Sequence, residues 1–206
     1  MAKRLVLLDF RLVGMVSADV GEVMQVNVRT PIKEAFDKVA ARARQLGGLD
    51  DLLICCHGIQ LDGAHEDALM SLRTQGGLGL QLCAENLNFP NMGVTGILKG
   101  PPPLVTRIVV FSCGAANTHP ALKNQFGDGM RLMGEIALTT GARVVASSET
   151  QVYYKIPSLV QSLFNAGSQN DWRIDFGDWE GDVFEFSPDD GVGRKLKPAQ
   201  HPRFDF

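Results

Sequence analysis

Two side chains suited to acyl-transfer chemistry each follow a short apolar run. His57 directly follows Leu52–Cys56. Cys113 follows Ile108–Phe111 with one residue, Ser112, between them. A thiol is a strong natural nucleophile, and a histidine that titrates near neutrality can protonate a leaving group or activate water. If the two runs are neighbouring parallel strands, both side chains reach the same edge of the sheet. The pair then has the residue types that a thioester mechanism needs.

A glycine follows each of these two side chains, Gly58 after the histidine and Gly114 after the cysteine. Glycine has no side chain to keep a substrate carbonyl away from the backbone. We expect the backbone amides of Gly58 and Cys113 to donate to the oxyanion of a tetrahedral intermediate. Gly114 is expected among the substrate-binding residues.

The cysteines allow two other interpretations. Cys113 could be an inert core thiol and His57 a structural histidine. Cys55 and Cys56 beside His57 also suggest a metal site completed by Cys83 or Cys113. Adjacent residues of a strand point to opposite faces, however, and no C-x-x-C pair occurs in the sequence. We therefore predict no metal or other cofactor, and expect Cys55 and Cys56 to support His57 from the core.

The three remaining histidines are weaker candidates for the catalytic base. His65 lies in a polar stretch and is expected to be solvated, and His201 lies in a proline-containing tail. His119 follows Cys113 by a few residues and could approach the same cleft. It is the reserve candidate for the base.

Apolar runs alternate with segments of helical spacing along most of the chain, which predicts an α/β sandwich around a largely parallel sheet. The expected strands are Leu5–Phe10, Val23–Val28, Leu52–Cys56, Gly79–Leu82, Arg107–Phe111 and Arg143–Ala146. Helices are expected from Pro31 to Leu46, around 122–140 and from Pro157 onward, and a loop is expected over 58–77.

The last residues differ in composition from the rest. Residues 171–206 hold both tryptophans, Trp172 and Trp179, and a turn sequence at Pro188–Gly191 that predicts a β-hairpin. Since 206 residues suit one large domain, we expect residues 1–170 to form the catalytic domain. The aromatic tail, 171–206, is expected to pack on it as an extension.

A strand that ends in His-Gly, followed about 50 residues later by a strand that ends in Cys, resembles the caspase-like cysteine peptidases. The segments Ile54–Gly58 and Val109–Cys113 are most similar to the bacterial CHAT-type, separase-related branch. Gly141–Ser148 resembles the strand that borders the substrate groove there, which makes Ser147 and Ser148 expected substrate-binding residues. The resemblance covers roughly residues 4–165.

This resemblance implies a caspase-like three-layer αβα sandwich and a cysteine endopeptidase with Cys113 as nucleophile and His57 as acid and base. It also implies a protein or peptide substrate and an activating partner. In such peptidases a charged residue at the end of the first strand sets part of the specificity. Asp9 would favour a basic residue before the cut and Arg11 an acidic one, and Glu149 is a further candidate for the pocket. The residues that flank Cys113 depart from the Gln-Ala-Cys pattern of caspases, which argues against caspase-type aspartate specificity.

Charge and hydropathy narrow the classes of partner. The chain has 20 basic and 23 acidic residues, without the basic excess of a nucleic-acid-binding protein. Asp9 and Arg11 interrupt the first apolar run before it reaches the length of a signal peptide, and no later run is long enough to span a membrane. We expect a cytoplasmic protein. A catalytically silent interaction module and a thiol amidohydrolase for small molecules stay open as alternatives.

Overall fold

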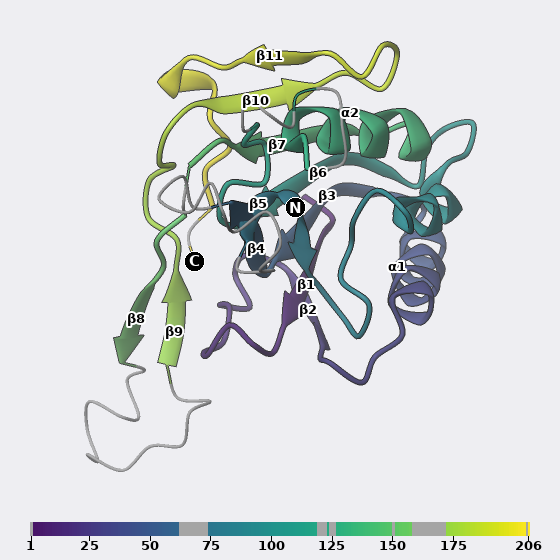
Figure 1. Cartoon of the computed structure of the whole chain (residues 1–206). Helices are drawn as coiled ribbons and strands as arrows, with labels where there is room; N and C mark the ends of the chain where they lie inside the picture. Colours follow the sequence, from purple (N-terminus) through teal and green to yellow (C-terminus); the bar gives the residue numbers. More distant parts are fainter. Residues whose placement is uncertain are drawn as a thin grey trace.

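The computed structural model describes residues 2–61, 74–118, 123, 127–149, 151–157, 172–204 and 206. Its central sheet consists of β1 (Arg4–Asp9), β2 (Glu22–Val26), β3 (Leu49–Cys55), β6 (Val105–Phe111), β7 (Arg143–Ser147), β10 (Val183–Phe186) and β11 (Gly193–Lys195). The strands follow the order β11-β10-β7-β6-β3-β1-β2 (Figure 1). The five strands from β7 to β2 are parallel, and β10 and β11 are antiparallel to their neighbours. The predicted α/β class with a mostly parallel sheet is confirmed.

The central strands are buried on both faces, as parallel strands usually are. β3 begins at Leu49, three residues before the apolar run that predicted it. Asp51 looked like the boundary of that run, yet it lies inside the strand and is only 4% exposed. Its carboxylate pairs with Arg107 on β6 at 2.7 Å and with Arg4 on β1 at 3.3 Å. An ion pair across the sheet thus allows a charged residue inside the strand.

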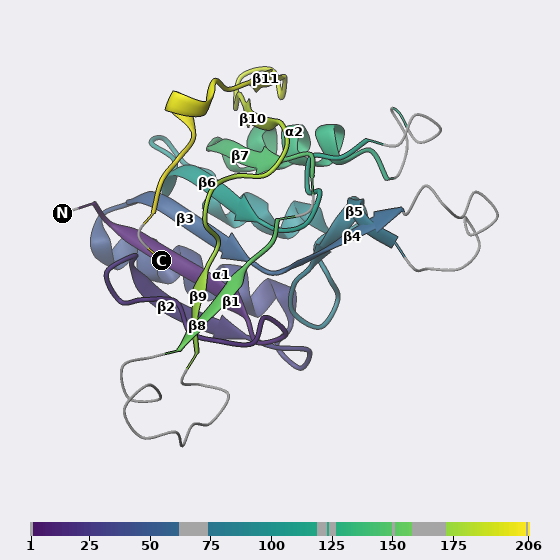
Figure 2. The same cartoon turned by 90° about the vertical axis from the view of Figure 1, so that its left-hand side faces the viewer.

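The two longest helices, α1 (Ile32–Leu46) and α2 (Gly129–Thr140), pack against one face of the sheet together with the short 3-10 helix η2 (Met92–Leu98). Figure 2 shows α1 and α2 behind the sheet. Pro31 precedes α1 as its N-cap, so the helix begins one residue later than predicted. The carboxylate of Glu85 accepts a hydrogen bond from the backbone amide of Ile32 at 2.8 Å. This amide is in the first turn of the helix and has no acceptor within it.

The opposite face is covered without a helix in the described part of the chain. A second apolar cluster there combines sheet residues with the segment after β1 and with the chain's last third. Its members are Val6, Leu8, Leu12, Val16, Val20, Leu53, Cys55, Val109, Phe111, Ile174, Phe176 and Phe206. The helices α1 and α2 therefore form one layer, and the three-layer αβα arrangement is not found among these residues. Pro157, expected to open a helix, is the last residue of a strand, and residues 158–171 lie outside the described ranges.

Two pairs of strands lie outside the central sheet. β4 (His57–Leu61) pairs with β5 (Thr74–Gln81), and β8 (Tyr154–Pro157) pairs with β9 (Trp172–Asp175), both antiparallel. The prediction of a loop over 58–77 was therefore wrong at both ends. These polar, glycine-containing stretches form strands because each has the other as a hydrogen-bonding partner. Residues 62–73 between them lie outside the described ranges.

The tail joins the domain in two ways. β10 and β11 form the predicted hairpin, which extends the central sheet through the pairing of β10 with β7. Aromatic side chains of the tail gather around Phe111, where Phe176 and Trp179 stack on its ring at centroid distances of 4.8 and 4.7 Å. Phe206 meets the same ring edge-on at 4.9 Å. These side chains join the tail to the apolar cluster on the helix-free face of the sheet. None of the described helices combines the length and apolar character needed to cross a membrane.

Candidate active site

His57 and Cys113 each lie two residues beyond the end of one of two neighbouring parallel strands, β3 and β6. Cys55 at the end of β3 pairs with Phe111 at the end of β6. Two residues beyond this pair, the chain reaches His57 on one side and Cys113 on the other. The register of the sheet therefore brings the two candidate catalytic residues to the same level of its carboxyl edge, where ligand sites of such sheets lie.

The backbones at these two points are in direct contact. A methyl group built on Gly58 would collide with the carbonyl oxygen of Cys113 and come within 3.0 Å of the Ser112 hydroxyl oxygen. The close approach requires glycine at this position, although the group that comes close is the carbonyl of Cys113 and not that of a substrate.

One short segment after β7 contacts both side chains. The Cys113 sulfur lies 3.7 Å from the carbonyl oxygen of Gln151. Two residues further, the Tyr153 ring lies beside the imidazole of His57, with ring centroids 6.3 Å apart. No pattern in the sequence indicated Gln151 or Tyr153, because their place beside the pair depends on how this segment folds back.

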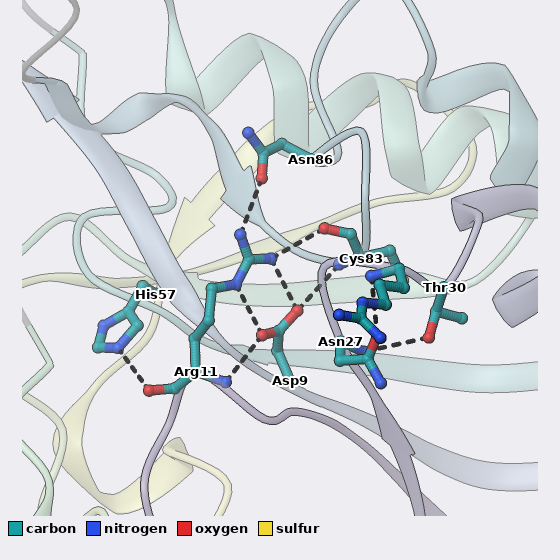
Figure 3. A network of polar contacts seen from close by, with 8 residues as sticks. Asp9, Arg11, Asn27, Thr30, His57, Cys83 and Asn86 are labelled. Atoms are coloured by element: carbon teal, nitrogen blue, oxygen red, sulfur yellow. Dashed lines mark hydrogen bonds and ion pairs between the residues drawn. The ribbon is translucent and has the colours of Figure 1, made fainter.

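The ring of His57 is oriented by a backbone carbonyl. Its Nε2 lies 3.3 Å from the carbonyl oxygen of Arg11, in the segment that follows β1 (Figure 3). A carbonyl oxygen only accepts, so Nε2 carries the proton and donates it. In the neutral ring Nδ1 is then the nitrogen with a free lone pair, which is the form that a general base needs.

Cys113 is the accessible thiol of the four. It is half-buried, whereas Cys55, Cys56 and Cys83 are fully buried. Burial raises the pKa of Cys55 and of Cys56 well above the usual range, and it raises the pKa of Cys83 to about 12. Three of the thiols therefore stay protonated and unreactive at neutral pH, since only the thiolate is a good nucleophile.

Cys55 and Cys56 face opposite sides of the sheet, as the strand geometry predicts. Cys56 lies in the core under the helices, and Cys55 belongs to the cluster on the other face. The two sulfurs therefore do not share one metal ion. Among the described residues, no three His, Cys, Asp or Glu side chains converge in a way that would hold a metal.

The amide of Gly114 is already in use. It donates to the carbonyl oxygen of Glu149 at 2.7 Å, and the residue has a φ of +54°, which glycine adopts without strain. Gly114 turns the chain after the cysteine and ties it to the loop after β7. The amides of Gly58 and Cys113 remain the candidates for an oxyanion site.

The expected groove residues after β7 have separate roles. Ser147 is fully buried, donates its hydroxyl to the carbonyl oxygen of Glu180 and accepts the Glu149 amide at 3.1 Å. The carbonyl oxygen of Ser148 accepts from the Asn117 side chain at 3.0 Å. Both serines hold the loop in place, whereas the Glu149 side chain is exposed beside it.

Glu180, which the sequence did not single out, supports this loop from the tail. Its carbonyl oxygen accepts from the Gln151 side chain at 3.0 Å, and its carboxylate accepts the Val152 amide at 2.8 Å. The Glu180 amide also donates to the side-chain oxygen of Gln151 at 3.5 Å, so with the bond from Ser147 four hydrogen bonds connect Glu180 to β7 and the loop that contacts Cys113.

Asp9 does not face a substrate. It is fully buried, and both of its carboxylate oxygens are hydrogen-bonded to the Arg11 guanidinium at 2.8 Å. These bonds raise the pKa of Arg11 above its usual value, so its guanidinium stays charged. The expectation that Asp9 attracts a basic substrate residue conflicts with this geometry, because Arg11 already provides the positive charge that such a residue would bring.

The other three histidines were the weaker candidates for the base, and only one of them lies in the described part of the chain. His65 and His119 lie outside the described residues. His201 lines a cavity of about 700 Å³ that is formed within the tail, by residues near Trp179 and near Phe204.

No family model, curated protein or solved structure matches the chain in comparisons with known proteins. The arrangement of residues at the carboxyl edge of the sheet therefore carries the functional argument alone.

Proposed function

We propose that the chain is a cysteine endopeptidase of the caspase-like kind, which cleaves protein or peptide substrates in the cytoplasm. The observation that carries the proposal is the register of β3 and β6, which aligns His57 with the accessible thiol of Cys113. The hydrogen bond from His57 to the Arg11 carbonyl supports it further, since it leaves Nδ1 free to accept a proton.

In the proposed reaction the Cys113 thiol passes its proton to His57 and the sulfur attacks the scissile carbonyl carbon. The carbonyl oxygen becomes an oxyanion, which the amides of Gly58 and Cys113 stabilise. The C–N bond then breaks, and His57 gives the proton to the leaving amine. Water attacks the thioester with His57 as base, which releases the carboxylic acid and restores the thiol.

We propose that the carboxylate of Glu149 binds a charged residue of the substrate. Val110 pairs with Ala146, and Cys113 and Glu149 each follow this pair by three residues, beyond the ends of β6 and β7. Its carbonyl oxygen holds the Gly114 amide, while its carboxylate is exposed and forms no ion pair with a described residue. An exposed carboxylate beside the nucleophile favours a basic residue in the peptide.

A peptidyl probe with a thiol-reactive warhead tests the proposal. We expect it to label the wild-type chain, to fail with Cys113→Ala and to fail or slow strongly with His57→Ala. Cys55→Ala and His201→Ala serve as matched controls, and both should retain labelling if folded by circular dichroism. Cleavage of a proteome-derived peptide library should accompany labelling.

Three outcomes would contradict the proposal. Peptide binding without labelling or cleavage would replace the proposal by a silent interaction module. Turnover of small amides without any peptide cleavage would replace it by a thiol amidohydrolase. Loss of labelling in Cys55→Ala but not in Cys113→Ala would refute the choice of nucleophile.

A further inference from the structure

The buried carboxylate of Asp9 collects four donors at the carboxyl end of β1. The Arg11 backbone amide donates at 3.0 Å, its Nε and Nη2 each at 2.8 Å, and the backbone amide of Cys83 at 2.9 Å (Figure 3). No lone pair of this carboxylate is left to face solvent, since the side chain is fully buried. The carboxylate of Asp9 is therefore fully engaged by donors inside the protein.

The Arg11 guanidinium is held just as firmly. Besides Asp9, its Nη2 donates to the carbonyl oxygen of Cys83 at 3.0 Å, and Nη1 lies 3.5 Å from the side-chain oxygen of Asn86. Cys83 thus has both its amide and its carbonyl bound by one ion pair. Its φ of +62° is uncommon for a residue with a side chain, and these two bonds compensate for it.

Both partners of His57 are attached to this ion pair. The Arg11 carbonyl oxygen accepts the proton of Nε2, so the turn that Asp9 fixes also fixes the acceptor. On the other side, the backbone of His57 pairs with Gln81 on β5, and Cys83 comes two residues after Gln81. One ion pair therefore anchors the acceptor of the ring and the strand beside it.

We infer that Asp9 and Arg11 are positioning residues for His57 and not readers of substrate charge. The pair holds the Arg11 carbonyl where it selects the Nε2–H tautomer, which leaves Nδ1 as the base. The catalytic consequence rests on the proposed function, whereas the tautomer is a property of the folded chain with or without activity.

The opposite end of the same strands offers a matched control. Asp51 is also a buried carboxylate bound by arginines, Arg107 and Arg4, but it lies at the amino ends of β1, β3 and β6. Asp51→Asn removes a comparable buried charge. It should leave the carboxyl edge of the sheet undisturbed, so any effect specific to Asp9→Asn is not a general loss of a buried ion pair.

The test is ¹⁵N NMR of the histidine ring nitrogens in uniformly labelled protein, with the His57 signals assigned by His57→Gln. We expect wild type and Asp51→Asn to show Nε2 protonated and Nδ1 free. Asp9→Asn should shift both nitrogens toward a mixture of tautomers. Arg11→Lys keeps the charge but loses the two-point contact, and as a milder change it provides a second variant, with a shift in the same direction.

Folded Asp9→Asn and Arg11→Lys with wild-type nitrogen shifts would overturn the inference. So would an equal shift in Asp51→Asn. If the chain is a peptidase, Asp9→Asn should lower kcat about tenfold or more with little change in KM, because a misoriented base affects the chemical step. If no variant and no wild type cleaves peptides, the proposed function fails, while the NMR result still decides the role of the ion pair.

Discussion

Gly58 lies so close to the carbonyl oxygen of Cys113 that no side chain fits between them. The contact joins the residue after the candidate base to the candidate nucleophile itself. The contact holds the two strand ends together. The geometry of the candidate oxyanion site therefore depends on glycine at position 58.

Gly58→Ala should therefore damage both stability and chemistry. The added methyl group forces the two strand ends apart, at a cost of about 1–3 kcal/mol in the free energy of unfolding. Urea unfolding measures the loss, and probe labelling of Cys113 should slow. Gly93→Ala is the control, since nothing lies within 4 Å of a methyl group there. Equal stability of the two variants would contradict the contact.

Iodoacetamide at neutral pH should modify one thiol in the native chain. Cys113 is half-buried, while burial keeps the other three cysteines protonated and covered. Peptide mapping should find the label on Cys113 alone, and on all four cysteines in guanidinium. Native modification of Cys83 at a comparable rate would show that its surroundings are open.

Alkaline solutions should weaken the fold through the buried thiols. A Cys pKa raised by folding means that the unfolded chain releases the proton first, so the free energy of unfolding falls as pH rises above the ordinary thiol pKa. For Cys83 this window runs from about 9 to about 12. Cys83→Ala removes this thiol. The fall of the free energy of unfolding with pH should then become less steep by about 1.4 kcal/mol per pH unit in that range. Urea midpoints at pH 7 to 11 test this, and an unchanged slope would contradict it.

Glu149→Gln should change which peptides are cleaved. Removing the exposed carboxylate should reduce a preference for a basic residue before the cut, by about tenfold for one lost charge contact of ordinary strength. Profiling of peptide libraries measures the change. Asp178→Asn, an exposed carboxylate of the tail, is the control. A basic preference that survives Glu149→Gln would require another acidic group.

The aromatic cover of the sheet predicts a large effect at Phe206. Its ring is 7% exposed and packs edge-on against Phe111. Phe206→Ala should lower the free energy of unfolding by about 3 kcal/mol, as is usual for a core phenylalanine. Phe10→Ala, at a position 57% exposed, should change it by less than about 0.5 kcal/mol. Similar urea midpoints for both variants would exclude the packed position of Phe206.

The parts of this fold that depend on local pattern were predictable. The apolar runs before His57 and Cys113 predicted β3 and β6, and the helical spacing of apolar residues after Pro31 predicted α1. The strand β4 was missed because its stability comes from pairing with β5, which the sequence around Gly58 does not reveal.

The candidate site was predictable only as far as it depends on strand ends. His57 and Cys113 were found because parallel strands end at one edge. The sequence left open whether Asp9 or Arg11 faces a substrate, because it does not show that the two side chains bind each other and bury the carboxylate. Glu180 was missed for the same reason, since its contacts with Gln151 exist only after the tail has folded back.

The hydrogen bonds of Glu180 have a consequence for the order of events during synthesis. The chain leaves the ribosome from its amino end, so His57 and Cys113 emerge well before Glu180 does. Until then the loop beside the cysteine lacks the four hydrogen bonds that connect it and the end of β7 to Glu180, and Phe111 lacks the ring of Trp179 that stacks on it. A nascent chain thus carries both side chains before Glu180 can hold the segment around them. The chemistry proposed for His57 and Cys113 would therefore begin only after Glu180 has been synthesised.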